Sequence, residues 1–354
     1  MSIIHYGYDF GAFISALFLF EFGADRFIAH TATIASRAGI SEATLGLVTA
    51  VAGWGQLTAI VVSLERVQFS LALGTVIGSA ISNILGAFSF GLLCYEEGSA
   101  VEFDRSSRIH SLLTLILTTV VIPLIYFQTT EVWLNCAGFL MIGYVVYFSI
   151  VAVKIRRSAR TASEDSDNDG DDNGDDCDEN DARSVGSTTG LLADGSNQNV
   201  GQHRLSYHVL YTFFGLLAIC LASYVLSQAA IEIIKRYRIS DVLFGVVILT
   251  NAITLPGNFI AVKRGHRGYS GILVANCAGS NIVLLSLCCG MVMGDAKGFL
   301  NGDNVTVFEL AVLWISTAAF AGTVWFGARF PRRIGRFMVA GYVAFIILEF
   351  AVIH

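Results

Sequence analysis

The sequence predicts an all-α polytopic membrane protein, with ten transmembrane helices arranged as two inverted five-helix repeats. Three features carry this prediction: the composition, the number of long apolar stretches, and a repeat within the sequence. Of the 354 residues, 54% are hydrophobic and only 14% are charged, and the mean hydropathy is +0.64. These values are typical of a chain that lies mostly in lipid, so the lipid bilayer is its first expected partner.

Ten stretches of the chain are long and apolar enough to cross a membrane, because a spanning helix needs roughly 20 mostly apolar residues. Five of them precede and five follow a polar tract at 154–204. We therefore expect a multi-pass integral membrane protein. The ten predicted spans are 10–33, 42–63, 69–95, 108–127, 131–153, 206–234, 241–262, 269–293, 304–327 and 334–353.

The orientation follows from basic residues beside the helix ends, because such residues favour the cytosolic side of a membrane. Clusters at 154–160, 263–267 and 329–336 follow the fifth, seventh and ninth spans, so all three fall on one side. A smaller cluster at 235–238 lies on the other side. We expect the three clusters to face the cytosol and both termini to face the outer or lumenal side.

The tract at 154–204 separates a first unit, 1–153, from a second, 205–354. Within it, 164–181 carries 11 acidic and no basic residues. This composition cannot bury enough apolar surface to form a core, which predicts a disordered acidic cytosolic loop. The segment 165–176 also matches part of an EF-hand calcium loop, with Asp176 where a bidentate Glu is expected. Loose attraction of cations by an Asp-rich tract is the alternative, and the sequence identifies no protein partner for the loop.

An internal repeat relates the two units. The run Gly39-Ile-Ser-Glu-Ala-Thr-Leu-Gly recurs as Arg238-Ile-Ser-Asp-Val-Leu-Phe-Gly, at an offset of 199 residues. Gly78-Ser-Ala-Ile recurs as Gly279-Ser-Asn-Ile, at an offset of 201. Because five is an odd number of spans, the two units are inverted relative to each other. Transporters built in this way hold their substrates near the middle of the membrane, between the repeats.

Two further runs near the N-terminus complete a resemblance. Phe18-Leu-Phe-Glu-Phe-Gly-Ala-Asp-Arg-Phe-Ile and Ile34-Ala-Ser-Arg-Ala-Gly-Ile-Ser, together with the two repeats, resemble the sodium/calcium exchanger membrane region of the calcium/cation antiporter superfamily. The resemblance implies ten helices and two so-called alpha-repeats, at about 42–95 and about 241–293. It also implies antiport of calcium against sodium or protons by alternating access.

The first alpha-repeat departs from the family pattern at its ligand. The family has Gly-Thr-Ser-Leu-Pro-Glu, whose Glu binds the cation. This chain has Gly53-Trp-Gly-Gln-Leu-Thr. The Glu is therefore replaced by Thr58, or by Gln56 if the alignment is counted back from the following helix. In either case the carboxylate is missing.

The second alpha-repeat reads Ala252-Ile-Thr-Leu-Pro-Gly, so Thr254 and Pro256 are kept and Gly257 replaces the Glu. Proline removes a backbone hydrogen bond, which either frees carbonyls for an ion or only kinks the helix. Both readings remain open from the sequence.

The helix after each repeat keeps part of the family's ligand set. Ser79 and Asn83 occupy the ligand positions in the first half, and Ser280 occupies one in the second. Leu284 stands where the family often has a polar or acidic ligand. The resemblance thus implies a site of neutral oxygen ligands, with Ser79, Asn83, Thr254 and Ser280 as the metal ligands.

The residues themselves also indicate a polar centre. Asn251, Thr254 and Asn258 are spaced i, i+3 and i+7, which places them on one helical face. Without carboxylates such a site suits a monovalent or a weakly bound divalent cation, because calcium prefers charged oxygens. Helix-to-helix hydrogen bonding is the alternative. The candidate cation-binding residues are Gln56, Thr58, Ser79, Asn83, Asn251, Thr254, Asn258, Asn276, Ser280 and Asn281.

The functional prediction is a membrane cation antiporter that exchanges calcium or another cation for sodium or protons. One alternative is a transport-inactive member that acts as a regulatory or binding protein through its acidic loop. A second is a monovalent cation/proton exchanger that uses Asp25 or Glu232, which with Glu21 are acids within or beside predicted spans. No enzyme, nucleic-acid partner or cofactor is expected beyond the transported cation, since no Walker loop, His-Glu-x-x-His motif or nucleophile elbow occurs.

Overall fold

The computed structural model describes residues 2–37, 54–95, 101–127, 130–164, 205–266, 270–295 and 305–353. In these residues the chain forms ten helical segments. Among the same residues there is one isolated antiparallel β-bridge, between Val101 and Ala328. Each segment overlaps one of the ten predicted spans, so the all-α polytopic fold is confirmed. Seven described helices are long and apolar enough to cross a membrane, and Gly55–Glu65 and Asp241–Thr254 are shorter apolar helices.

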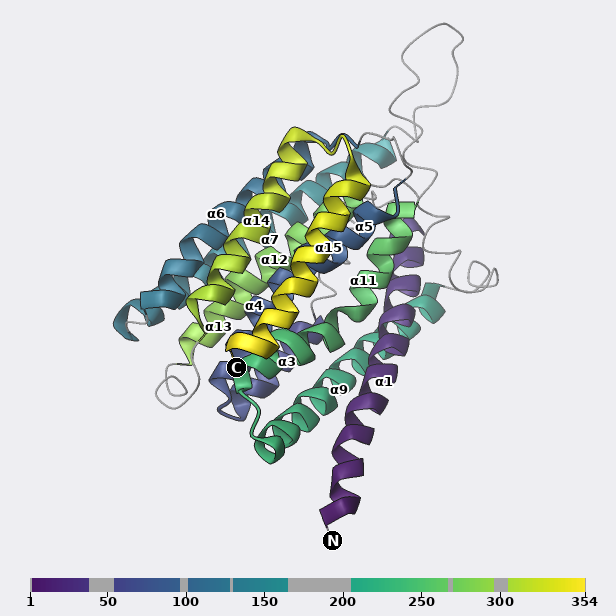
Figure 1. Cartoon of the computed structure of the whole chain (residues 1–354). Helices are drawn as coiled ribbons and strands as arrows, with labels where there is room; N and C mark the ends of the chain where they lie inside the picture. The colour runs from purple at the N-terminus through teal and green to yellow at the C-terminus, as the bar shows by residue number, and fades with distance from the viewer. Residues whose placement is uncertain are drawn as a thin grey trace, which may run out of the picture.

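Five of the ten segments are continuous helices and five are composite or short. In chain order they are α1 (Ser2–Arg37), α3 (Trp54–Glu65), α4–η2–α5 (Phe69–Ile81, Ser82–Phe88, Ser89–Leu93), α6 (Arg105–Phe127), α7 (Thr130–Glu164), α9 (Leu205–Tyr237), α10–η4–α11 (Asp241–Leu243, Phe244–Leu249, Thr250–His266), α12–η5–α13 (Ser270–Val283, Leu284–Cys288, Cys289–Gly294), α14 (Val307–Phe326) and α15–η7 (Pro331–Leu348, Glu349–Ile353). Helices α1 and α9 lie side by side at one edge of the bundle (Figure 1).

Two predicted boundaries differ from the structure. Helix α7 continues to Glu164, so the start of the predicted loop at 154–204 is helical. Lys, Arg and Ala are strong helix formers, and they carry the helix past the apolar stretch that the prediction used to end it. The acidic segment 165–204, with its EF-hand-like run, lies outside the described residues. The first part of the predicted span 42–63 lies outside them too.

Wide π-helical turns interrupt the helices near the polar residues. They occur at η2, η4 and η5, and η2 and η5 fall at nearly equivalent places in the two repeats. In a π turn the backbone N–H bonds to the carbonyl five residues earlier instead of four, so one carbonyl can be left without its usual N–H partner. A nearby side-chain hydroxyl can then donate a hydrogen bond to that carbonyl. Thr250 Oγ1 does this by donating to Gly245 O at 2.8 Å. The irregular backbone thus lies before Pro256, whereas α11 runs through that proline as a helix.

Glycines bring α4 and η4 into backbone contact. A Cβ added to Gly74 would lie 2.9 Å from Val242 O, and one added to Gly245 would lie 2.7 Å from Leu71 O. Small residues at such crossings let membrane helices approach closely. This contact holds α4 close to η4 and so fixes how the polar side chains of the third and seventh spans face each other.

Replacing Gly78 with alanine should therefore destabilise the protein. The new Cβ would lie 2.3 Å from Val246 O and 2.7 Å from Thr250 Oγ1, so the helices must move apart. We expect a loss of about 1–3 kcal/mol, the usual range for overpacking, measured as a lower thermal unfolding temperature in detergent micelles. Gly322→Ala is the matched control, because nothing lies within 4 Å of its added Cβ. Equal unfolding temperatures for the two variants would contradict the account.

Candidate functional site

Two pairs of hydroxyl groups join the third and seventh spans at the middle of the bundle. Ser79 Oγ lies 3.4 Å from Thr250 Oγ1, and Ser82 Oγ lies 3.0 Å from Thr254 Oγ1. All four side chains are buried. We call this group the hydroxyl seam; it contains two of the predicted ligands, Ser79 and Thr254.

The direction of the hydrogen bonds in the hydroxyl seam follows from counting hydrogens. Each hydroxyl has one hydrogen, and Thr250 and Thr254 direct theirs to the carbonyls of Gly245 and Thr250, at 2.8 and 2.9 Å. The serine hydroxyls therefore donate to the threonines. Their own oxygens keep lone pairs that can face a cation.

Two asparagines connect the third span to the eighth. Asn83 Nδ2 donates to Asn281 Oδ1 at 2.9 Å, and Asn281 Nδ2 donates to Ala80 O at 3.1 Å. Ala80 and Asn281 are equivalent positions of the sequence repeat, so the contact links the two halves where their helices cross. The amide nitrogens of both residues are used in these bonds, which leaves Asn83 Oδ1 as an acceptor on the seam helix.

Asn258 has a buried acceptor that lacks a hydrogen-bond partner among the described residues. Its Oδ1 atom is inaccessible to solvent, and the side chain is 9% exposed. A Cβ placed on Gly86 would lie 3.6 Å from this oxygen and 3.4 Å from Ser82 Oγ, so Asn258 faces η2 beside the hydroxyl seam. An unpaired buried carbonyl oxygen is unfavourable, and a cation beside it would remove the penalty.

The amide of Asn251 is already satisfied on both sides. Its Nδ2 donates to Val247 O at 2.7 Å, and its Oδ1 accepts from Tyr342 Oη at 2.8 Å. Tyr342, on α15, is buried. Asn251 therefore attaches α15 to the seventh span, which is the helix-to-helix hydrogen bonding that the sequence left open as the alternative to a ligand role.

The remaining candidates lie away from the hydroxyl seam or beside it without a described bond. Thr58 Oγ1 donates to Cys220 Sγ at 3.7 Å, which turns it toward α9. Gln56 is buried on α3. Asn276 and Ser280 are half-buried on α12.

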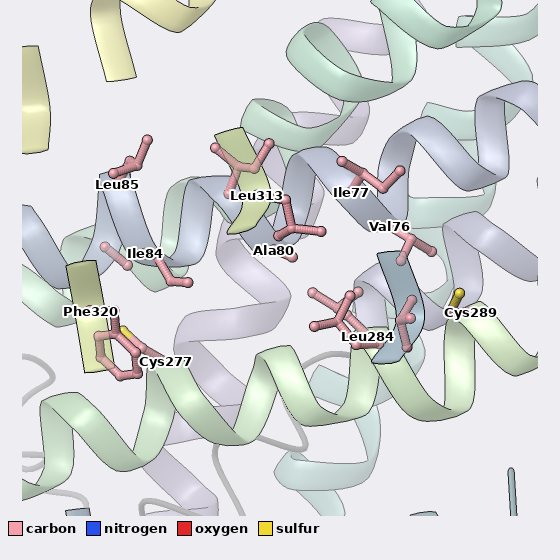
Figure 2. Close-up of a cluster of buried hydrophobic side chains, with 14 of the residues drawn as sticks. Val76, Ile77, Ala80, Ile84, Leu85, Cys277, Leu284, Cys289, Leu313 and Phe320 are labelled. Atoms are coloured by element: carbon pink, nitrogen blue, oxygen red, sulfur yellow. The ribbon is translucent and has the colours of Figure 1, made fainter. Parts of the chain in front are cut away.

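Leu284 and Gly257 stand at positions where the resemblance leads one to expect a polar or acidic cation ligand, and neither side chain carries a charge. Leu284 packs into the apolar cluster with Val76 and Ala80, between the third and eighth spans (Figure 2). Gly257 is half-buried, and nothing lies within 4 Å of a Cβ added to it. One family ligand position is thus filled by packing, whereas the other is open. In addition, no group of three or more His, Cys, Asp or Glu side chains able to hold a metal occurs in the described residues.

The acids that the sequence singled out are on the surface. Glu21, Asp25 and Glu232 are exposed, and the guanidinium carbon of Arg26, next to Asp25, lies 5.2 Å from the centroid of the Phe22 ring. Their exposure gives no support to a proton site at these residues.

Two buried acids were missed by the sequence reading. Glu309 and Glu349 are both 0% exposed. Glu309 belongs to a Thr-x-x-Glu capping box that begins at Thr306, which is a signal readable from the sequence. Glu349 lies inside the predicted span 334–353, where an acid should have been noted as unusual.

A helical membrane bundle with a polar seam between inverted repeats is the arrangement found in many membrane transporters. The sodium/calcium exchanger protein family matches residues 8–153 and 207–351, so the chain belongs to that family. The acidic tract falls between the two matched regions. Family members are transporters of cations, which agrees with the predicted class.

Solved structures share the fold at low sequence identity. The sodium-calcium exchanger NCX_Mj soaked with 10 mM Na⁺ and zero Ca²⁺ is 18% identical, with a TM-score of 0.60 over 97% of this chain and 98% of that chain. Native YfkE is 15% identical, with a TM-score of 0.65 over 96% of this chain and 92% of that chain. No curated protein matches the sequence. These similarities confirm the fold.

Proposed function

We propose that the protein exchanges cations across a membrane by alternating access, and that the transported cation binds beside the hydroxyl seam. Its ligands would be the oxygens of Asn258, Asn83, Ser79 and Ser82. The observation that carries the proposal is the buried Oδ1 of Asn258, which lacks a described partner and faces the seam helix. A bound cation would supply the partner that the described residues do not.

The ligand chemistry favours a monovalent cation, or a divalent cation held weakly. Amide and hydroxyl oxygens solvate a cation but carry no formal charge, and a divalent ion loses far more hydration energy on burial. Calcium remains the alternative cargo that the family suggests, with sodium or protons as the counter-ion. The neutral seam predicts that calcium, if carried, binds with low affinity.

The arrangement of the helices supports alternating access. The α1–α9 pair lies along one edge of the bundle and packs on the rest through α3, α11 and η4 (Figure 1). In transporters with inverted repeats, one helix group rocks against the other around a fixed central site. We expect α1 and α9 to be the moving group here.

Ion flux into proteoliposomes tests this proposal. Purified protein should support uptake of labelled sodium, potassium or calcium when an opposing gradient of a second cation is imposed. Uptake that depends on the opposing gradient is the expected result. Thermal unfolding checks that the reconstituted protein is folded. The proposal fails if this folded protein gives no flux above that of empty liposomes with any pair of these cations or with a proton gradient.

A second function is favoured by the bonds within the hydroxyl seam. Ser79–Thr250 and Ser82–Thr254 join helix to helix, which is what polar residues do in a membrane protein that only packs. The protein would then be a transport-inactive member that acts through its acidic loop. Deleting 164–181 should in that case abolish the cellular effect of the protein while Asn258→Ala leaves it intact, and the reverse pattern would exclude this reading.

A further inference from the structure

The imidazole rings of two buried histidines meet between α1 and α9. His30 lies about two turns before the end of α1, and His208 lies in the first turn of α9. Their Nδ1 atoms are 3.0 Å apart, and the side chains are 2% and 0% exposed. The two helices that carry this pair contribute nothing to the hydroxyl seam, so the pair is a polar contact separate from the candidate cation site.

The bond between the two rings limits how many protons the pair can hold. A neutral imidazole carries one proton, on either Nδ1 or Nε2, and a charged one carries both. A hydrogen bond from Nδ1 to Nδ1 needs a proton on one of these atoms and a lone pair on the other. The bond can therefore form when both rings are neutral or when one is charged. It is lost when both rings are charged, because each Nδ1 then carries a proton.

The position of the pair disfavours two positive charges. Both rings are buried, and taking a charged group out of water is unfavourable. His208 also lies at the N-terminus of α9, where the helix dipole opposes a positive charge. Arg26 precedes His30 by four residues on α1, so a cation is already present on the same helical face. Two neutral rings that share one proton are thus the expected state at neutral pH.

The other titratable groups near the pair come from the elements that pack on α1 and α9. On α9 itself, the rings of Tyr207 and Tyr211 lie 5.8 and 5.0 Å from the ring of His30. Helix α1 also packs on α11, whose charged residues are all basic and lie in its last turn, at 263–266. Helix α9 also packs on η4, which has no charged residue, and on α3, whose one acid, Glu65, is exposed at the helix end.

The histidine pair joins α1 and α9 at one end of their contact. Near the opposite end, Arg236 and Asp9 form an ion pair at 3.3 Å. Between the two ends the backbones touch, since a Cβ added to Gly215 would lie 3.0 Å from Gly23 O. The helices therefore run antiparallel and side by side (Figure 1). A change at the histidines acts on one end of this contact while the other points hold.

We propose that His30 and His208 form a proton-binding site that joins α1 to α9, and that uptake of protons by both rings separates this end of the two helices. The bond is present at higher pH and is lost as the pH falls, because the doubly charged pair cannot form it. Unperturbed imidazole changes charge between about pH 5 and 8. Since α1 and α9 are the helices expected to move during exchange, loss of the bond should slow exchange. This effect rests on the proposed function, whereas the proton site rests on the two buried rings.

Nitrogen NMR of the full chain in lipid bilayers, with isotopically labelled histidine, tests the proton site without transport. Near neutral pH two Nδ1 resonances should correlate through the N–H···N bond, and the correlation should disappear reversibly in acid. His30→Asn should lack it at every pH, because asparagine has no ring nitrogen. His110→Asn should keep it, since His110 Nδ1 bonds within α6, to Ser106 O at 2.8 Å.

Two results of this measurement would exclude the proton site. The first is wild-type protein without the correlation near neutral pH. The second is a correlation that persists throughout the range in which imidazoles titrate. A correlation that His110→Asn removes and His30→Asn keeps would belong to other histidines and would exclude the site as well.

Cation flux measured against pH then tests the effect on exchange. Wild type and His110→Asn should lose flux severalfold between neutral pH and the acid end of the imidazole range. His30→Asn and His208→Asn should each give a severalfold flatter profile, because an asparagine amide can donate to a neutral ring or accept from a charged one. Identical profiles for wild type and both variants would overturn the effect on exchange. If the correlation is lost in acid but no cation is carried at any pH, that effect and the proposed exchange fail together, while the proton site stands.

Discussion

Asn258→Leu should lower the rate of cation exchange at least about tenfold, which corresponds to about 1.4 kcal/mol. Leucine has the same number and branching of side-chain heavy atoms as asparagine, with two methyl groups in place of the amide nitrogen and oxygen. The variant removes only the amide, including the buried oxygen that lacks a described partner. Initial flux into proteoliposomes, at equal amounts of folded protein, measures the effect.

Thr58→Val is the matched control for this prediction. Both residues are polar candidates from the alpha-repeats, but Thr58 is directed to Cys220 on α9, away from the hydroxyl seam. We expect its exchange rate to stay within about twofold of wild type, as for other substitutions away from a binding site. The assignment of Asn258 is wrong if its leucine variant transports like wild type, or if the two variants are impaired equally.

Gly257→Glu should increase the apparent affinity for calcium at least about tenfold. The position matches the family's cation-binding Glu, and an added Cβ meets nothing within 4 Å, so the side chain has room to enter. A carboxylate near a divalent ion in a partly buried site contributes more than the about 1.4 kcal/mol that a tenfold change needs. Calcium uptake measured as a function of calcium concentration gives the half-saturation value.

The control for this substitution is Gly257→Gln, which has the size of Glu and no charge. A comparable gain in calcium affinity with Gln would show that shape rather than charge is responsible. No gain with Glu, in a protein that still folds and exchanges its natural cation, would place the cation site away from Gly257.

The ten spans could be predicted because length and hydropathy suffice to identify a membrane helix. Where a helix leaves the membrane is harder to predict, since the signal then changes from hydropathy to helix propensity. This explains why the predicted end of the fifth span at 153 falls short of the end of α7 at Glu164. The π-helical turns at η2, η4 and η5 could not be predicted either, because they depend on how the helices pack.

The candidate site was only partly readable from the sequence. The repeat placed Ser79 and Thr254 in facing helices, and the structure has them in adjacent pairs of the hydroxyl seam. Periodicity could not distinguish Asn251, whose amide is fully bonded, from Asn258, whose Oδ1 lacks a partner among the described residues, because both lie on one helical face and only their partners differ. The bond from Tyr342 comes from a helix distant in sequence, which no local pattern reveals.

Locating a bound cation tests the central claim most directly. An electron-rich monovalent cation such as Rb⁺ or Tl⁺ can be diffused into crystals of the protein and located by its anomalous scattering. The account predicts a peak within coordination distance of Asn258 Oδ1 and the serine oxygens of the hydroxyl seam. A strong peak elsewhere in the bundle, with none beside Asn258 in protein that exchanges that cation, would contradict it.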